Sequence, residues 1–180
     1  SLPLIPKRIF FKEPKRGEIV VFKTPEDNRT DYIKRLIGLP GDRVSMKSNI
    51  IFLNGKAIEQ KFINDEKYKE LDVSKFEESF ENKNTYQVFE FKKNSIFINT
   101  NDFNEIVIPE NQYFVLGDNR DNSQDSRFIG TIPKENLVGR AELVFLSFDT
   151  NIGSFLKFWT WFPALRKDRF FTSLIPDKSN

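Results

Sequence analysis

The chain has 180 residues, enough to bury one hydrophobic core or one core with a sizeable insertion. Its 28 basic and 26 acidic side chains nearly cancel, so no strong field favours nucleic acid. Cysteine and histidine are both absent, which excludes disulfides, thiolate metal sites and catalysis by Ser-His or Cys-His pairs within the chain. Lysine, serine, tyrosine and the carboxylates remain as candidate catalytic groups. The 20 phenylalanines favour strands, and we expect an all-β, or mainly β, fold.

The chain opens with an apolar stretch followed by two predicted strands. Residues 1–11 are interrupted by prolines and too short to span a membrane, and they read as the middle of a longer protein. Ser1 could be an autoprocessed nucleophile, although a chain cut from a longer one explains it more simply. Residues 18–23 (EIVVFK) and 31–37 predict strands that could pair as a hairpin.

Residues 31–42, DYIKRLIGLPGD, place two long cations in an apolar strand. Alternation puts Lys34 and Arg35 on opposite faces, and the Pro40-Gly41 pair then predicts a type II turn. If either face is buried, only the lysine can lose its proton, so Lys34 is the candidate general base. The alternative is an ordinary lysine whose stem packs while its amine reaches water.

Residues 45–105 predict a second, smaller β domain inserted into a core domain of residues 1–44 and 106–180. Within it, Asn54-Gly55 predicts a tight hairpin turn. Residues 61–84 are highly charged and predict either an irregular amphipathic helix or a solvated excursion. Further strands are expected at residues 43–46, 49–53, 56–59, 85–92, 95–98 and 105–108.

The C-terminal part predicts two strands and an aromatic tail. Residues 112–116 (QYFVL) form a compact predicted strand, and residues 138–148 a long closing one. Residues 152–175 mix aromatic rings with lysine and arginine, which suits a lipid headgroup layer but not a membrane span. Rings that cap the core would explain this composition equally well.

Residues 117–127, GDNRDNSQDSR, gather three carboxylates, two guanidinium groups and two hydroxyls. An EF-hand is excluded, because the sixth position counted from Asp121 is Ser126 and the twelfth is Ile132. A loop of Asx turns would account for the composition. Alternatively, the arginines pair with the loop's own carboxylates and leave a hydroxyl free to hold a neighbouring amine, as a neutral lysine base requires.

Four motifs together resemble one known family. RGEIVVF, DYIKRLIGLPGD and GDNRDNSQDSR occur in that order, followed by FPALRKDRFF, and the chain resembles the bacterial type I signal peptidases, or leader peptidases. The resemblance implies a membrane-associated serine endopeptidase that removes signal peptides after small-x-small sites by a Ser/Lys dyad. It places the catalytic domain on the periplasmic side of the bacterial inner membrane and implies neither a cofactor nor a metal.

The resemblance also assigns roles to residues. Lys34 matches the general base, and Ser123 matches the serine that orients its amine. Arg35 with Asp118, and Arg127 with Asp125, match structural ion pairs. The residues that match structural supports of the site are Arg35, Asp118, Arg120, Asp125 and Arg127. The strand that the substrate lies against is matched by Asp31, Tyr32 and Ile33.

Two departures from the family pattern stand out. Glu18 occupies a position where aspartate is usual, a minor change. The family's nucleophile lies in a Ser-Met-x-Pro motif upstream of RGEIVVF, which residues 1–4 (SLPL) do not match. We therefore expect the chain to begin downstream of the nucleophile and the membrane anchor, and to be inactive as it stands.

The expected partners are signal peptides of secreted preproteins and, through the C-terminal aromatic segment, the membrane lipid surface. We expect a monomer that does not bind nucleic acid. Three alternatives stay open: an inactive homologue, a β-barrel binding module such as an oligonucleotide-binding fold, and a self-cleaving repressor-type protease.

Overall fold

The computed structural model describes residues 13–68, 71–81, 84–92, 101–140, 143–144, 172–173 and 177–178. Most of these residues lie in strands of antiparallel sheets, and the helical content is one short α-helix and one 3-10 turn within the described ranges. The expectation of a mainly β protein is therefore confirmed.

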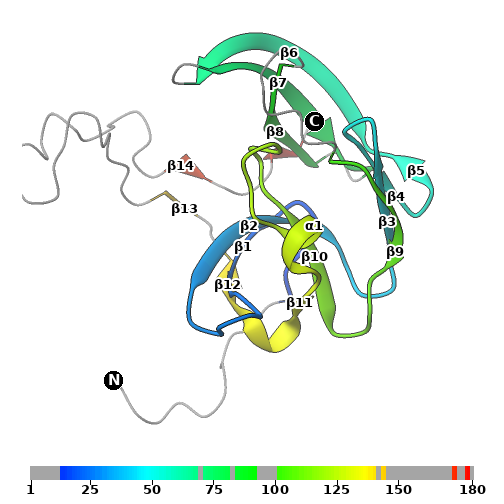
Figure 1. Ribbon diagram of the computed structural model, residues 1–180, viewed down its shortest axis with the longest axis vertical. Helices are drawn as coiled ribbons and strands as arrows, with labels where there is room; N and C mark the ends of the chain where they lie inside the picture. The colour runs from blue at the N-terminus through cyan, green and yellow to red at the C-terminus, as the bar shows by residue number, and fades with distance from the viewer. Residues whose placement is uncertain are drawn as a thin grey trace, which may run out of the picture. The chain divides into compact units, whose positions relative to one another are not determined.

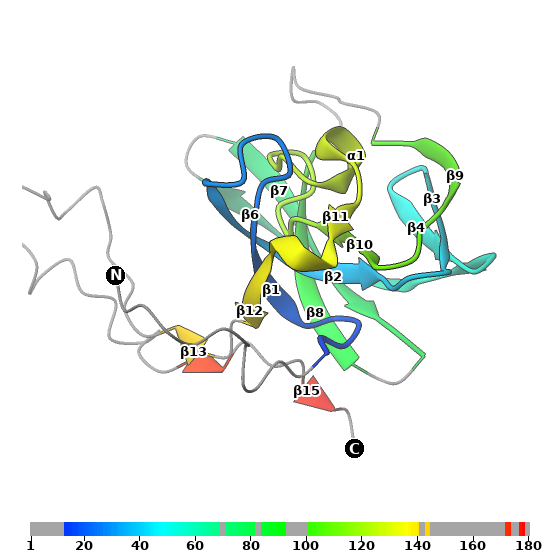
Figure 2. The ribbon, with the colours of Figure 1, turned by 90° about the horizontal axis from the view of Figure 1, so that it is seen from below.

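A five-stranded sheet carries the lysine strand at its centre (Figure 1). The predicted hairpin is confirmed, since β1 and β2 pair antiparallel with Val20 opposite Lys34. Figure 2 shows β2 between β1 and β10, as the strand order requires. In that order the strands are β11 (Ile132–Pro133), β10 (Gln112–Leu116), β2 (Asp31–Gly38), β1 (Ile19–Lys23) and β12 (Leu137–Arg140).

The middle of this sheet is buried on both faces. Leu36 of β2 and Val115 of β10 lie in one hydrophobic cluster, whereas Ile37 and Leu116 lie in another. Because successive side chains of a strand point to opposite faces, the two clusters cover the two sides of β2 and β10. This double burial fixes the strand that carries Lys34.

A four-stranded sheet follows the lysine strand. The Pro40-Gly41 turn has the predicted geometry, with Gly41 at a φ of 85° and the Asp42 N–H donating to the Leu39 carbonyl at 3.0 Å. Positive φ angles at Asn54 and Gly55 confirm the second predicted turn. The strands in order are β5 (Lys56–Ala57), β4 (Ile50–Leu53), β3 (Arg43–Lys47) and β9 (Phe103–Val107).

The prediction of an amphipathic helix over residues 61–84 was wrong, since the segment forms strands, whereas the alternative of a solvated excursion holds for the exposed residues 61–67. This segment forms most of a second four-stranded sheet, in which the long hairpin of β6 (Glu59–Tyr68) and β7 (Leu71–Ser79) curves away from the five-stranded sheet (Figure 1). Phe62 and Phe76 stack edge-to-face across the hairpin at 5.8 Å, and the Phe76 ring packs on the core. Charged side chains of residues 61–67 are exposed on the edge strand β6, where they oppose pairing with other chains, whereas Glu78 on the inner strand β7 is buried. In order the strands are β15 (Asp177–Lys178), β8 (Asn84–Phe91), β7 (Leu71–Ser79) and β6 (Glu59–Tyr68).

Several sequence predictions fall outside the described residues. These are the apolar stretch at residues 1–11, the strand at 95–98 and most of the tail at 152–175. The predicted closing strand is represented by β12 and by β13 (Leu143–Val144), which pairs with β14 (Thr172–Ser173) in a separate unit of residues 141–175. The division into a core domain and an insertion of residues 45–105 stays a prediction.

Candidate active site

Lys34 lies half-buried in β2, with its Nζ 5.5 Å from the centre of the Tyr32 ring. It lines a cavity of about 220 Å³ together with Ile33, Gly117, Asn119 and Ser123, among other residues. Burial lowers the pKa of the Lys34 amine, and Arg127 acts in the same direction, while Asp125 and Asp118 oppose it. The amine is therefore held toward its neutral form, as a general base must be.

Ser123 reaches the same cavity from the acidic loop at residues 117–127. Its Oγ is buried and makes no hydrogen bond to any described residue, so its predicted bond to the Lys34 amine is not formed here. Ser123 packs so tightly on Gly117 that a Cβ built on the glycine would lie 2.1 Å from the hydroxyl oxygen. Glycine at position 117 thus lets the serine approach the lysine strand, and its orienting role stays a prediction.

Asp125 is the fully buried centre of this loop. Its carboxylate accepts hydrogen bonds from the Gly117 N–H at 2.9 Å and from the Arg127 Nε and Nη2, both at 2.8 Å. It also caps the helix α1, Ser126–Ile129, by accepting from the Arg127 N–H. One carboxylate therefore joins the two ends of the loop that carries Ser123.

Arg35, next to Lys34, points to the other face of β2 and anchors the start of the loop. Its Nε and Nη2 donate to the two carboxylate oxygens of Asp118, each at 2.7 Å, and its Nη1 donates to the Gly17 carbonyl at 2.6 Å. Such a bidentate arrangement fixes both distance and angle. Adjacent cations in one strand thus differ in state, one paired and one held toward neutrality.

The other arginine of the loop corrects a prediction. Arg120 does not pair with a carboxylate of its own loop, because its guanidinium donates to both carboxylate oxygens of Glu78 in β7. The backbone of the loop also pairs with β8, since the Phe89 N–H donates to the Asp118 carbonyl at 2.8 Å. Asp121 accepts from the Phe91 N–H at 2.6 Å. None of these contacts to β7 and β8 could be read from the motif, because the partners lie about 30 to 40 residues away in sequence.

The first half of β2 has an open edge beside the cavity. Pairing with β10 ends at Arg35, opposite Leu116. The Leu36 N–H donates to Glu18 and the Leu36 carbonyl accepts from Gly17, so even-numbered residues of β2 turn their peptide groups toward β1. Ile33 therefore turns its N–H and C=O the other way, where the described part of the chain supplies no pairing strand.

A family model described as "Signal peptidase, peptidase S26" matches residues 3–146. The chain belongs to this signal peptidase family. Signal peptidase I of Rickettsia typhi is 40% identical over 192 residues, which cover 96% of this chain and 70% of that protein, and the same values hold for Rickettsia felis. The motif resemblance is thereby confirmed. A solved signal peptidase I of Enterococcus faecalis V583 shares 27% identity at a TM-score of 0.49, covering 73% of this chain and 99% of that one.

The predicted site residues of this signal peptidase family member are not all equally close to the cavity. Ile33, Lys34, Arg35, Asp118 and Ser123 line it, whereas Asp31 is exposed and pairs with Lys23 at 3.1 Å. Sequence reasoning missed four further lining residues, Ile19, Gly117, Asn119 and Asn122, of which Asn119 has a buried Oδ1 without a described partner. The signals that could have found them are the GDNRDNS motif for Gly117, Asn119 and Asn122, and the strand paired with the lysine strand for Ile19.

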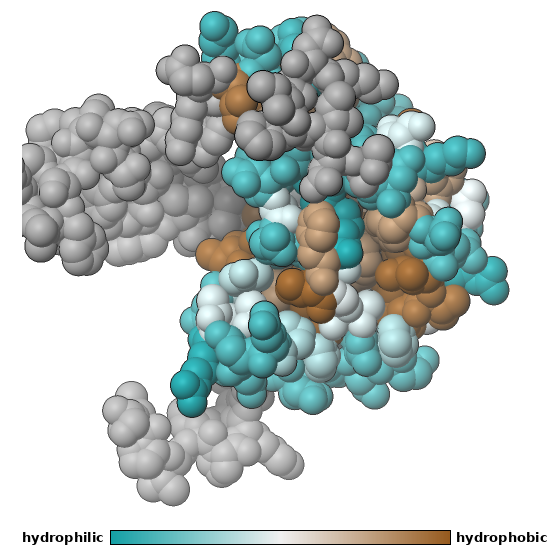
Figure 3. All heavy atoms as spheres, in the orientation of Figure 1, coloured by the Kyte–Doolittle hydropathy of each residue, from teal (hydrophilic) through white to brown (hydrophobic). Residues whose placement is uncertain are grey.

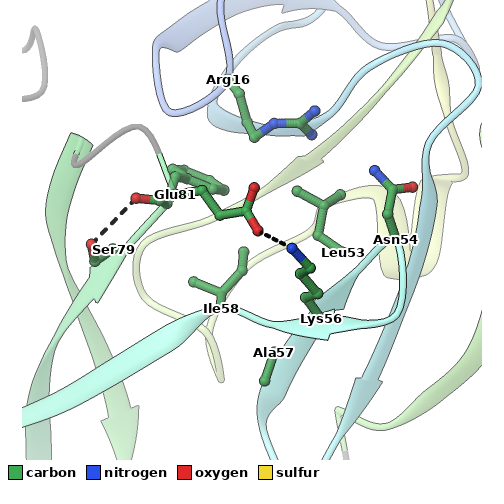
Figure 4. A pocket seen from close by; sticks show the side chains of 9 residues that line it. Arg16, Leu53, Asn54, Lys56, Ala57, Ile58, Ser79 and Glu81 are labelled. Atoms are coloured by element: carbon green, nitrogen blue, oxygen red, sulfur yellow. Dashed lines mark hydrogen bonds and ion pairs between the residues drawn. The ribbon is translucent and has the colours of Figure 1, made fainter.

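A second cavity, of about 310 Å³, lies between the β4–β5 hairpin and the end of β7 (Figure 4). Lys56 and Glu81 form an exposed ion pair at its mouth, and the Arg16 Nη1 is bonded to Asp42 and to the Ile37 carbonyl. Lys56 and Arg16 already pair with carboxylates, so neither corresponds to the Lys34 amine of the first cavity as a candidate base.

The remaining surface adds little chemistry. Figure 3 shows a largely hydrophilic face with separate apolar patches. Among the described residues, no cluster of acidic side chains could hold a metal ion, and no helix is long and apolar enough to cross a bilayer.

Proposed function

We propose that this protein is a serine endopeptidase that removes N-terminal signal peptides from exported preproteins after small-x-small sites. The observation that carries the proposal is the half-buried Lys34 amine, whose pKa is lowered by burial, in one cavity with the Ser123 hydroxyl and beside an unpaired strand edge. Membership of the signal peptidase family supports the same reaction.

Lys34 acts as the general base in this proposal. Its neutral amine takes the proton from a serine hydroxyl as the serine oxygen attacks the scissile carbonyl, and the resulting ammonium gives that proton to the leaving amine. Water activated by the same amine then hydrolyses the acyl-enzyme. Ser123 orients the amine through its hydroxyl, once the lysine and the serine approach each other in the complex.

The substrate binds as an added strand on the edge at residues 31–33. The N–H and C=O of Ile33, which no strand of the described residues pairs with on this side, offer main-chain hydrogen bonds to an extended peptide, and alternate side chains of that peptide point into the cavity. In this proposal the Ile19 and Ile33 side chains narrow the cavity, so that small residues are preferred at those positions. This mode of binding explains selection of small-x-small sequences.

The nucleophile in this proposal is the serine of the family's Ser-Met-x-Pro motif, which the printed sequence does not contain, and a chain without that serine would be inactive. The aromatic and basic tail at residues 152–175 holds the site at the outer surface of the bacterial inner membrane. Flotation of the protein with anionic liposomes, with and without residues 152–175, tests that contact, and equal flotation of both forms rejects it.

The main experiment is cleavage of a preprotein by the full-length protein and by its Lys34→Ala variant. We expect the variant to lose activity to the uncatalysed background while its thermal unfolding temperature changes little, because the side chain is half exposed. Lys47→Ala, at an exposed lysine at the end of β3, is the matched control and should keep full activity. Normal processing by Lys34→Ala would reject Lys34 as the base.

A further inference from the structure

Among the ion pairs in the described part of the chain, only the Arg127–Asp125 pair is buried as deeply as the Glu78–Arg120 pair. The two side chains are 2% and 1% exposed, and the Arg120 Nη1 lies 2.6 Å from the Glu78 Oε1, with a second parallel contact between Nη2 and Oε2. Glu78 lies on β7 and Arg120 in the acidic loop. A buried bidentate pair between these two segments fixes the loop against the β6–β8 sheet in one geometry.

From Arg120 the contacts continue toward the cavity. The Arg120 N–H donates to the Phe89 carbonyl at 2.9 Å, and the Arg120 carbonyl accepts from the Arg127 Nη2 at 2.6 Å. Arg127 in turn binds Asp125, which accepts the Gly117 N–H. An unbroken series of hydrogen bonds therefore leads from Glu78 to the glycine on which Ser123 packs.

The loop held in this way supplies much of the burial of Lys34. Gly117, Asp118, Asn119, Asn122 and Ser123 all line the Lys34 cavity. The charged groups that act on the Lys34 amine, namely Asp118, Asp125 and Arg127, also belong to the loop. A shift of the loop away from β2 would admit water and bring the pKa of the amine back toward its ordinary value.

We propose that Glu78 is a positioning residue for the proposed peptidase reaction, acting through Arg120 to hold the acidic loop and its Ser123 over Lys34. The inference rests on the proposed role of Lys34 and extends it to a residue outside every motif identified in the sequence. In this view the β6–β8 sheet is part of the catalytic apparatus, although its side chains do not touch the reacting atoms.

The test is the pH dependence of kcat/KM for preprotein cleavage by the full-length protein and its Glu78→Gln variant. Glutamine keeps the size of the side chain but removes the counter-charge of Arg120, so the loop should loosen. We expect kcat/KM at neutral pH to fall roughly 10- to 100-fold, since a misplacement of about 1 Å can have that effect. The acid limb should move to higher pH, because a more hydrated Lys34 holds its proton more tightly.

A purely structural role would lower stability without moving the acid limb. Ile51→Ala is the matched control, since Ile51 is 1% exposed in the hydrophobic cluster that includes Val88 and lies on β4. It should lower the thermal unfolding temperature and leave the acid limb in place. Glu78→Asp, which keeps the charge on a shorter stem, gives a second variant should Glu78→Gln not fold, and its acid limb should shift in the same direction by less.

Coupling to Ser123 completes the test. If Glu78 acts through the loop, adding Glu78→Gln to Ser123→Ala should reduce kcat/KM much less than Glu78→Gln does in the wild type. Unchanged acid limbs in both Glu78 variants, or full additivity with Ser123→Ala, would overturn the inference while leaving the proposed function intact. Activity in Lys34→Ala would instead reject the proposed function, so the two failures are distinguishable.

Discussion

Replacing Gly117 by alanine tests the contact that brings Ser123 to the lysine strand. An added Cβ would lie 2.1 Å from the Ser123 Oγ and 2.5 Å from its Cβ, where ordinary contacts begin at 3.4 Å. Rotation of the hydroxyl relieves the first clash but not the second, so the backbone of one partner must move by roughly 1 Å, enough to lower a rate about 100-fold. Overpacking of this kind costs about 1–3 kcal/mol of stability.

Two assays measure these effects separately. Urea unfolding of Gly117→Ala should give the predicted loss of stability, and preprotein cleavage by the full-length variant should give the larger loss of rate. Gly139→Ala is the control, because an added Cβ at Gly139 meets nothing within 4 Å, and its stability should stay within about 0.5 kcal/mol of the wild type.

The partner residue offers a rescue. Ser123→Ala keeps the offending Cβ, so it should not restore the stability of Gly117→Ala, whereas Ser123→Gly removes that atom and should restore most of it. If Gly117→Ala unfolds at the same urea concentration as the wild type and cleaves normally, the tight packing described here does not exist in solution.

Three further predictions concern single side chains. Because burial lowers the pKa of Lys34, the folded state binds its proton less tightly than the unfolded state, so Lys34→Met should be more stable than the wild type at neutral pH. That advantage should vanish as the pH approaches about 10.4, the ordinary lysine value, and urea unfolding at pH 7 and pH 10 checks it. Ser126→Ala should cost about 1–3 kcal/mol in the same assay, since the Ser126 hydroxyl accepts the buried Val115 N–H at 2.9 Å. Ile33→Lys should raise KM for preprotein cleavage yet change stability by less than about 0.5 kcal/mol, because Ile33 is 61% exposed, and an unchanged KM would argue against the strand edge as the binding site.

The sequence predicted the local features of this fold well. The β1–β2 hairpin, the Pro40-Gly41 turn and the Asn54-Gly55 turn all depend on residues that are neighbours in the chain, and all three were found. The strands within residues 61–84 were not predicted, because many charges are typical of solvated segments, whereas the structure pairs these residues in a sheet with β6 at its edge. Edge position is set by which strands pair, and that information is not local.

The site likewise has one part that could be predicted from neighbouring residues and another that depends on distant strands. Lys34 could be singled out because an amine in an apolar strand is the only cation there that can lose its proton. The partner of Arg120 could not, since Glu78 lies 42 residues away and carries no motif around it. Sequence reasoning offered the nearest carboxylates instead, and only the sheet topology brings β7 against the loop.

The alternation of β2 between two hydrophobic clusters has a consequence for mispairing. A slip of one residue against β1 and β10 would exchange the faces of every side chain, so that Arg35 would take the face that Lys34 occupies and Lys34 the face of Arg35. A guanidinium cannot be deprotonated in a protein, so the slipped form would be folded but would lack a general base. Burial of Leu36 and Ile37 on opposite sides, with the tight bend at Gly41, selects the one alignment in which a base exists at all.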